Sequence, residues 1–162
     1  MKFHPASYCI RCGTAVVLRF VHERQRPVCP ACGWIHFSDP KVAVEILVKQ
    51  AEKVLLVRRL NDPGKGLWSL PGGYMDSDES PIQAAERECR EETGLEVQVT
   101  GLIDVMQDRE FPASADVVIA YAASILGGEL RGGDDAAEAA FFPYSALPPI
   151  AFKVARKVLE LE

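Results

Sequence analysis

The stretch Gly73–Leu95 is GYMDSDESPIQAAERECREETGL, and its second half predicts a helix that the rest of the chain has to accommodate. Ser80 is a good helix N-cap, Pro81 suits the first helical position, and Gln83 completes a capping box with Ser80. Gly94 stands where a left-handed C-terminal cap is expected. The local signals therefore predict a helix that begins after Ser80 and ends before Gly94.

Three glutamates of this helix, Glu88, Glu91 and Glu92, fall on one flank beside its apolar stripe. Carboxylates this close repel one another unless a cation lies among them. Mg²⁺ prefers oxygen ligands and is commonly held by carboxylates together with substrate phosphates. A solvated acidic face is the alternative explanation for a glutamate-rich helix. The glycines beside the helix and its capping favour a metal site.

The same stretch resembles the Nudix box, G-x5-E-x7-R-E-U-x-E-E-x-G-U, in which U is a bulky apolar residue. The matching residues are Gly73, Glu79, Arg87, Glu88, Glu91, Glu92, Gly94 and Leu95. Cys89 replaces the usual Ile, Leu or Val, and a thiol still suits a buried apolar contact. The resemblance implies an α/β fold, a Nudix α/β/α sandwich with a mixed sheet. It also implies an enzyme, a Nudix pyrophosphohydrolase.

The resemblance assigns the metal site to particular residues. Glu88 and Glu92 are the main ligands it implies for Mg²⁺ or Mn²⁺, helped by the carbonyl of Gly73 and by Glu91. Paired glycines before the box would let that carbonyl approach an ion closely. Phosphoanhydride hydrolysis needs this ion to neutralise phosphate charge and to help position a water molecule.

The other charged residues of the box have supporting roles by the same resemblance. Arg87 would pair with Glu79 or Glu91 and hold the carboxylates in position. The general base is left open between Glu91 and Glu138, an acid that precedes the predicted last strand. The neighbouring Asp134 and Asp135 are equally compatible with solvated loop residues.

The N-terminal segment carries two cysteine knuckles, Cys9-x2-Cys12 and Cys29-x2-Cys32, each followed by glycine. The N-terminus lacks the apolar core of a signal peptide, so this spacing favours a four-cysteine zinc site over disulfides. A closed all-thiolate zinc site leaves no position for substrate water and is structural. Because a segment this short buries too little apolar surface on its own, the metal would replace a core. The segment resembles a zinc ribbon.

Ser38-Asp39-Pro40 marks the linker between the two parts of the chain. The predicted domains are a zinc ribbon over residues 1–38 and a Nudix hydrolase domain over residues 39–162. Apolar runs after the linker predict further strands and a closing amphipathic helix. The strands are expected at Val42–Val48, Val54–Val57, Leu95–Met106, Val117–Leu126 and Ala139–Pro143, and the helix at Phe152–Leu161.

The composition and charge of the chain limit the kinds of partner that it is expected to bind. The chain has 162 residues and a net charge of −5 at pH 7, with no apolar run of membrane-spanning length. A cytoplasmic location and no membrane contact are therefore expected. Residues 1–40 carry five Lys or Arg against two acids. These basic residues form no dense run with interleaved aromatics, so a nucleic-acid partner is not expected. A stabilising or dimerising cap is the preferred role of the ribbon, and a homodimer is a candidate assembly.

A zinc ribbon ahead of a Nudix box resembles the branch of ADP-ribose, FAD and NADH pyrophosphatases. The expected substrate is a nucleoside diphosphate linked to another moiety, and hydrolysis would release a nucleoside monophosphate. The Ser-Gln-Pro-Trp-Pro-Phe run usual in the NADH enzymes is replaced here by Asp108–Pro112. Candidate side chains for stacking on an adenine or flavin ring are Trp68, Tyr74, Phe111 and Phe152.

Two other functions remain open at the level of sequence. One is a Nudix hydrolase that sanitises the nucleoside triphosphate pool or acts on RNA caps. The other is a non-catalytic nucleotide sensor whose ribbon contacts nucleic acid or protein. A sensor would tolerate loss of carboxylates, whereas every acid of the box is present in this chain. Mg²⁺ or Mn²⁺ for catalysis and structural Zn²⁺ are the cofactors expected.

Overall fold

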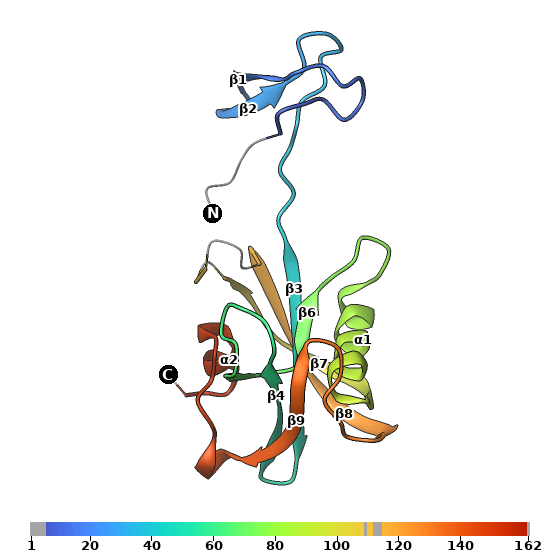
Figure 1. Cartoon of the computed structure of the whole chain (residues 1–162), viewed down its shortest axis with the longest axis vertical. Helices are drawn as coiled ribbons and strands as arrows, with labels where there is room; N and C mark the ends of the chain where they lie inside the picture. The colour runs from blue at the N-terminus through green and yellow to red at the C-terminus, as the bar shows by residue number, and fades with distance from the viewer. Residues whose placement is uncertain (1–5, 109, 112–114, 162) are drawn as a thin grey trace. The chain divides into compact units, whose positions relative to one another are not determined.

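The computed structural model describes residues 6–108, 110–111 and 115–161. The chain divides into two compact units, Met1–Pro40 and Lys41–Glu162. Figure 1 shows the elements of both, and each unit is described by itself. No helix in the described ranges is long and apolar enough to cross a membrane.

The first unit is built on a small antiparallel hairpin of β1 (Val17–Val21) and β2 (Arg24–Val28). The turn residues His22 and Glu23 both adopt positive φ, 50° and 63°, as in the tight turns that suit a twisted hairpin. Little of this unit is buried. Its buried residues in the described range are Cys9, Pro27, Val28 and Cys29. Side-chain packing alone therefore gives the ribbon almost no core.

The second unit contains all five predicted strands, together with two short ones that were not predicted. Its strands are β3 (Val42–Gln50), β4 (Lys53–Arg59), β5 (Trp68–Ser69), β6 (Gly72–Tyr74), β7 (Leu95–Gln107), β8 (Val117–Gly128) and β9 (Ala136–Pro143). Its helical elements are α1 (Pro81–Thr93), a 3-10 turn (Tyr144–Ala146) and α2 (Lys153–Val158). The closing helix is shorter than predicted, because Glu160 adopts a left-handed φ of 57° just beyond it.

These strands form a mixed sheet in the order β5-β4-β3-β8-β7, with β6 paired to β3 and β9 paired to β4. β3 and β8 run parallel, whereas the other pairs are antiparallel. In Figure 1 the strands lie between α1 on one side and α2 on the other. The predicted α/β/α sandwich with a mixed sheet is confirmed.

The side chains of β3 alternate between the two faces of the sheet and contribute to a separate hydrophobic cluster on each face. Val44 and Ile46 pack on the side of α1, whereas Ala43 and Leu47 pack on the side of α2. Glu45 shares the α2 side with these last two, because successive side chains of a strand point to opposite faces. The α1 side is completed by three buried helix residues, Ala84, Ala85 and Cys89. Cys89 therefore belongs to the core of the second unit.

Candidate active site

Helix α1 has the ends that the sequence predicts. The backbone N–H of Gln83 donates to Ser80 Oγ at 3.3 Å, and the N–H of Ser80 donates back to Gln83 Oε1 at 2.9 Å. At the other end Gly94 has a φ of 70° and donates its N–H to the carbonyl of Arg90 at 2.9 Å. These caps fix which turn of the helix carries the acidic residues.

Two glycines let the acidic turn of α1 pack against strand β6. The N–H of Gly72 donates to Glu92 Oε2 at 2.8 Å. A Cβ on Gly73 would lie 2.5 Å from the carboxyl carbon of Glu88. A Cβ on Gly72 would overlap the carbonyl oxygen of Val44 on β3. A side chain at Gly73 would displace the Glu88 carboxyl of the helix, and one at Gly72 would push β6 away from β3. Close approach therefore requires glycine at both positions.

Arg87 lies at the centre of an ion-pair network. Its Nε donates to Glu79 Oε2 at 3.0 Å and its Nη2 to Glu79 Oε1 at 2.6 Å, a bidentate pair. Its Nη1 donates to Glu88 Oε1 at 2.8 Å and to Glu91 Oε2 at 3.0 Å. The hydrogen bonds from Arg87 are the main reason that the pKa of Glu79 falls to about 2. Glu79 therefore anchors the guanidinium while Arg87 reaches the two helix carboxylates.

Glu92 and Glu88 are the acids of this turn that are withdrawn from solvent. Glu92 is only 3% exposed, and burial raises its pKa to about 9, helped by the facing carboxyls of Asp135 and Glu88. Burial also raises the pKa of Glu88, against the opposing effect of Arg87. A cation bound beside these carboxyls would favour their ionised forms and lower their pKa values. Such groups gather at functional sites.

The loop before β9 brings Asp135 to this cluster. The backbone N–H groups of Arg131 and Gly133 donate to the carbonyls of Thr93 and Glu92, at 2.9 and 3.1 Å. This attaches the loop to the end of α1 and turns Asp135 toward Glu92. Sequence reasoning left Asp135 as a possible solvated loop residue. The loop's attachment to the helix is long-range information that local patterns do not carry.

Glu138, the other predicted base, lies elsewhere. It stands opposite Arg58 in the β4–β9 register, and the two side chains form an exposed ion pair with an Nη2–Oε2 distance of 3.1 Å. It does not line the pocket described below, so its catalytic role stays a prediction. Glu91 lies on the acidic turn itself, with a side chain 40% exposed.

A pocket of about 460 Å³ opens on the α2 side of the sheet and reaches the glycine pair. Of the four predicted stacking residues, Tyr74 and Phe152 line it. Trp68 instead packs edge-on against Phe142 with ring centroids 4.6 Å apart, and Phe111 packs edge-on against Phe152 at 6.2 Å. The structure thus brings two of the four aromatics to the pocket.

The pocket also holds charged residues that sequence reasoning missed. Lys41 places its Nζ 5.5 Å from the centre of the Tyr74 ring, and the Arg59 guanidinium lies 4.7 Å from the centre of the Phe152 ring. Glu45 is nearly buried, and burial raises its pKa to about 8, with Asp108 raising it further. A lone acid inside the apolar run VAVEILV was the available signal for Glu45.

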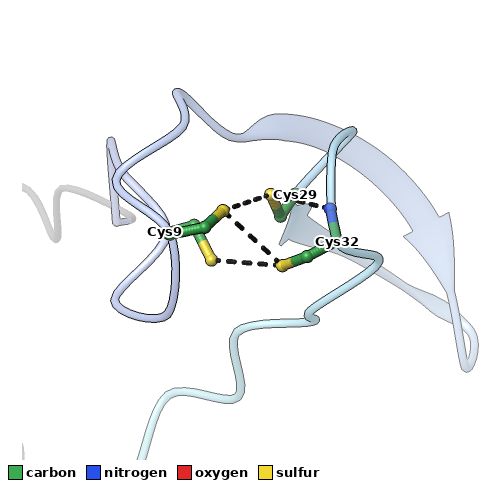
Figure 2. A group of neighbouring side chains, drawn as sticks. Cys9, Cys29 and Cys32 are labelled. Carbon is green, nitrogen blue, oxygen red and sulfur yellow. Dashed lines mark hydrogen bonds between the residues drawn. The ribbon is translucent and has the colours of Figure 1, made fainter.

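The four knuckle cysteines form a second cluster (Figure 2). The Sγ–Sγ distances are 3.5 Å for Cys12 and Cys29, 3.6 Å for Cys9 and Cys32, and 3.7 Å for Cys12 and Cys32. Four thiolates placed tetrahedrally at the usual Zn–S distance would be about 3.8 Å apart. All four are free of disulfides. The donor set therefore fits a tetrahedral metal ion.

Within the described residues, these cysteines are the only set of three or more metal-ligating groups whose ligand atoms lie within 4.8 Å of one another. The carboxylates of α1 form no such set, and their oxygens accept hydrogen bonds instead. Arg87 holds Glu88 and Glu91, and the N–H of Gly72 holds Glu92. An ion bound by these carboxylates would compete with these hydrogen bonds.

A sandwich with an acidic helix packed on a glycine pair, preceded by a four-cysteine ribbon, defines the class of Nudix proteins with an N-terminal ribbon. The chain belongs to the Nudix family. Residues 39–161 match the NUDIX domain, and residues 7–38 match the zinc ribbon described as Nudix N-terminal. The predicted family membership is confirmed, and the chain is a Nudix pyrophosphohydrolase.

The chain is similar to an ADP-ribose pyrophosphatase of Methanocaldococcus jannaschii, with 42% identity over 72% of this chain and 69% of that protein. It is 29% identical to the NAD-capped RNA hydrolase NudC of Pseudomonas aeruginosa, over 95% of this chain. The chain spans only about half of that relative, 54% of its length. Among solved structures, a NUDIX hydrolase from Nitrosomonas europaea matches with a TM-score of 0.85 and 32% identity, over 96% of this chain and 89% of that one.

The contact between Gly73 and Glu88 gives a first prediction. Gly73→Ala should lower kcat/KM by about 10- to 100-fold, because the new methyl group displaces the Glu88 carboxyl, a loss typical of disturbed metal-site neighbours. Gly101→Ala is the matched control, because a Cβ there meets nothing within 4 Å. Steady-state kinetics with thermal melts of both variants would check this. Equal activity of the two variants would contradict the placement of Glu88.

Proposed function

We propose that this chain hydrolyses the pyrophosphate bond of a nucleoside diphosphate linked to another moiety, such as ADP-ribose, FAD or NADH, and depends on Mg²⁺ or Mn²⁺. One observation carries the proposal: the buried carboxyl of Glu92 and the half-buried carboxyl of Glu88 adjoin the glycine pair, which lines a 460 Å³ pocket. The similarity to an ADP-ribose pyrophosphatase at 42% identity supports this substrate class.

In this proposal Glu88, Glu92, Glu91 and the carbonyl of Gly73 hold the divalent ions. Their donors are all oxygens, the set that Mg²⁺ and Mn²⁺ prefer. Bound ions of this kind neutralise phosphate charge and activate water. Arg87 acts through the carboxylates, because its bidentate pair with Glu79 keeps it beside Glu88 and Glu91. Glu79 and Arg87 are positioning residues in this scheme.

The proton acceptor for the attacking water is proposed to be Glu91. Its side chain is partly exposed on the acidic turn and therefore reachable by water. The alternative, Glu138, is paired with Arg58 across β4 and β9, and its Oε2 already accepts a hydrogen bond from Arg58 Nε. Asp135 faces Glu92 and adds a further oxygen donor beside the ions.

The rest of the pocket suits a nucleotide. Lys41 and Arg59 supply positive charge for phosphate oxygens, and the faces of Tyr74 and Phe152 lie beneath these cations. A ring of the substrate has an apolar lining to pack on, provided by Leu70, Val118 and Val154. Zn²⁺ in the ribbon is proposed to be structural, because its four thiolates leave no open coordination position.

A substrate panel tests this function. The full chain, with Mg²⁺ or Mn²⁺, should convert at least one of ADP-ribose, FAD and NADH to a nucleoside monophosphate, detected by mass spectrometry. Glu96→Gln, an exposed acid just beyond α1, should behave as the wild type. Absence of product from every compound, with both metals, would reject the proposed substrate class.

A second candidate is hydrolysis of an NAD-type cap on RNA. It is favoured by the NudC match, which extends over 95% of this chain and so includes the ribbon. The scissile bond is of the same kind, because NAD also contains a pyrophosphate between two nucleosides. Inclusion of a short NAD-capped RNA in the panel separates the two. A kcat/KM for the RNA at least tenfold above that for free NADH and ADP-ribose would favour this second candidate.

A further inference from the structure

Glu45 is a buried acid whose side chain has no evident structural purpose. It lies in the middle of β3, is 9% exposed, and points to the α2 side between Ala43 and Leu47. Its Oε2 is buried and finds no hydrogen-bond partner within the described part of the chain. Buried polar atoms of native proteins nearly always have partners, so this one requires an explanation.

The charged neighbours of Glu45 do not satisfy it. Arg59 and Asp108 are the groups whose charges act on its carboxyl. Arg59 donates its Nε to the carbonyl of Pro63 at 2.9 Å and stacks on the ring of Phe152. No ion pair within 4.0 Å joins Arg59 to Glu45 in the described residues. The described residues thus supply no partner for Glu45 Oε2, and a bound ligand could supply one.

The pocket is where such a partner would come from. Glu45 lines it among apolar neighbours that include Ala43, Leu70 and Val118. A buried carboxyl among apolar side chains disfavours the binding of a hydrocarbon group and favours the binding of a hydrogen-bond donor. Sites of this kind use few polar groups to orient a ligand. The group that meets Glu45 should therefore carry hydroxyl or amino hydrogens.

The strand register tells which part of a nucleotide reaches Glu45. Glu45 pairs with Gly72, and the next residue of β6, Gly73, packs on Glu88. Directly opposite residues of antiparallel strands are about 5 Å apart. Glu45 thus lies one residue from the end of the pocket where the pyrophosphate would bind. The moiety covalently attached to a nucleotide's phosphate is a ribose, and acidic residues bind ribose hydroxyls in other nucleotide sites.

We propose that Glu45 determines specificity by accepting hydrogen bonds from the hydroxyls of a ribose next to the scissile pyrophosphate. The inference rests on the proposed function for the identity of the substrate. The pocket then selects sugars with these hydroxyls, and a deoxy analogue leaves the buried carboxyl unpaired. Sites built to bind a hydroxyl reject analogues that lack it far more strongly than apolar pockets reject a missing methylene.

The test compares ADP-ribose with analogues lacking the 2′-hydroxyl of either ribose. Wild-type enzyme should prefer ADP-ribose over one analogue by about 100-fold or more in kcat/KM. Glu45→Met, close in size and apolar, should reduce that preference to less than threefold, whereas Glu45→Gln should keep part of it. Glu96→Gln, an exposed acid outside the pocket, should leave it unchanged. An unchanged preference in Glu45→Met would overturn the proposal.

Two further measurements exclude other roles. Half-saturation by Mg²⁺ should be the same in Glu45→Met and wild type, and a shift above threefold would make Glu45 a metal ligand instead. Glu45→Met should melt at or above the wild-type temperature, because an apolar group replaces an unpaired one. A clear fall in melting temperature would indicate a structural role. Greater loss of discrimination between adenine and hypoxanthine analogues than between ribose analogues would assign Glu45 to the base.

Binding measurements test the role of Glu45 independently of the proposed hydrolytic function. The α,β-methylene analogue of ADP-ribose cannot be hydrolysed, so its dissociation constant is measured by calorimetry whether or not the enzyme turns over. A ribose preference in binding that is lost in Glu45→Met supports the inference even if no substrate in the panel is cleaved. Turnover of ADP-ribose with no such preference in binding or rate rejects the role of Glu45 and keeps the function.

Discussion

Glu92→Gln is expected to reduce kcat/KM by about 10³-fold, a loss in the range seen when a charge-stabilising group is removed from an active site. The amide keeps the volume of the side chain and can still accept the hydrogen bond from Gly72. It lacks the negative charge that binds a divalent ion. Steady-state kinetics over a range of Mg²⁺ and Mn²⁺ concentrations would measure the loss.

Melting temperatures distinguish a loss of metal binding in Glu92→Gln from misfolding of the variant. Burial raises the pKa of Glu92 to about 9, above its ordinary 4.5, so ionisation at Glu92 opposes folding as the pH rises between these values. The neutral amide does not ionise and so avoids this loss of stability. Without divalent ions, the melting temperature of Glu92→Gln at pH 8 should therefore be no lower than that of the wild type. Glu96→Gln should be unchanged in both respects. Retention of more than a tenth of wild-type activity by Glu92→Gln would remove Glu92 from the metal site.

The parts of this site that the sequence predicts are those encoded by short-range patterns. The capping residues Ser80 and Gly94 set the limits of α1, and the spacing of the box places Glu88 and Glu92 on one turn. The structure confirms the predicted ends of the helix. It adds that Arg87 holds Glu88 and Glu91 at once, a contact whose geometry depends on side-chain rotamers.

The parts that the sequence does not predict depend on long-range register. β6 contains two glycines, which are poor strand formers, and becomes a strand only by pairing with β3. The regular register of β4 and β9 sets Glu138 opposite Arg58, while the preceding loop carries Asp135 to Glu92. Glu138, three residues after Asp135, instead forms an ion pair with Arg58. No local pattern distinguishes these two outcomes.

Glu45 illustrates a different limit of prediction from sequence. Its neighbours on both sides are apolar, so a periodic pattern predicts the strand correctly and gives the acid no role. Only the packing of β3 against α1 on one side and the pocket on the other shows that Glu45 faces a cavity. A charged residue inside a run buried on both faces is therefore a useful signal, because burial of an unpaired carboxyl is costly.

Removal of the ribbon metal is expected to unfold residues 7–38 while leaving residues 41–161 folded. In the described range of the ribbon only Cys9, Pro27, Val28 and Cys29 are buried, and two of these are cysteines of the cluster. Zinc binding by small modules of this kind is worth about 10–16 kcal/mol, which is more than so small a core supplies. Amide NMR spectra of the full chain should lose the dispersed signals of the ribbon after chelation.

Single cysteine variants give the matched comparison. Cys12→Ala should lose one equivalent of zinc and the ribbon signals, because three thiolates leave the tetrahedral site open to water. Cys89→Ala should keep its zinc, because Cys89 lies in the core beside α1 and is not one of the four clustered cysteines. Dispersed ribbon signals in metal-free protein would show that the hairpin of β1 and β2 folds without the ion. The argument from the small core would then fail, whereas the carboxylate site on α1, which shares no ligand with the ribbon, would be unaffected.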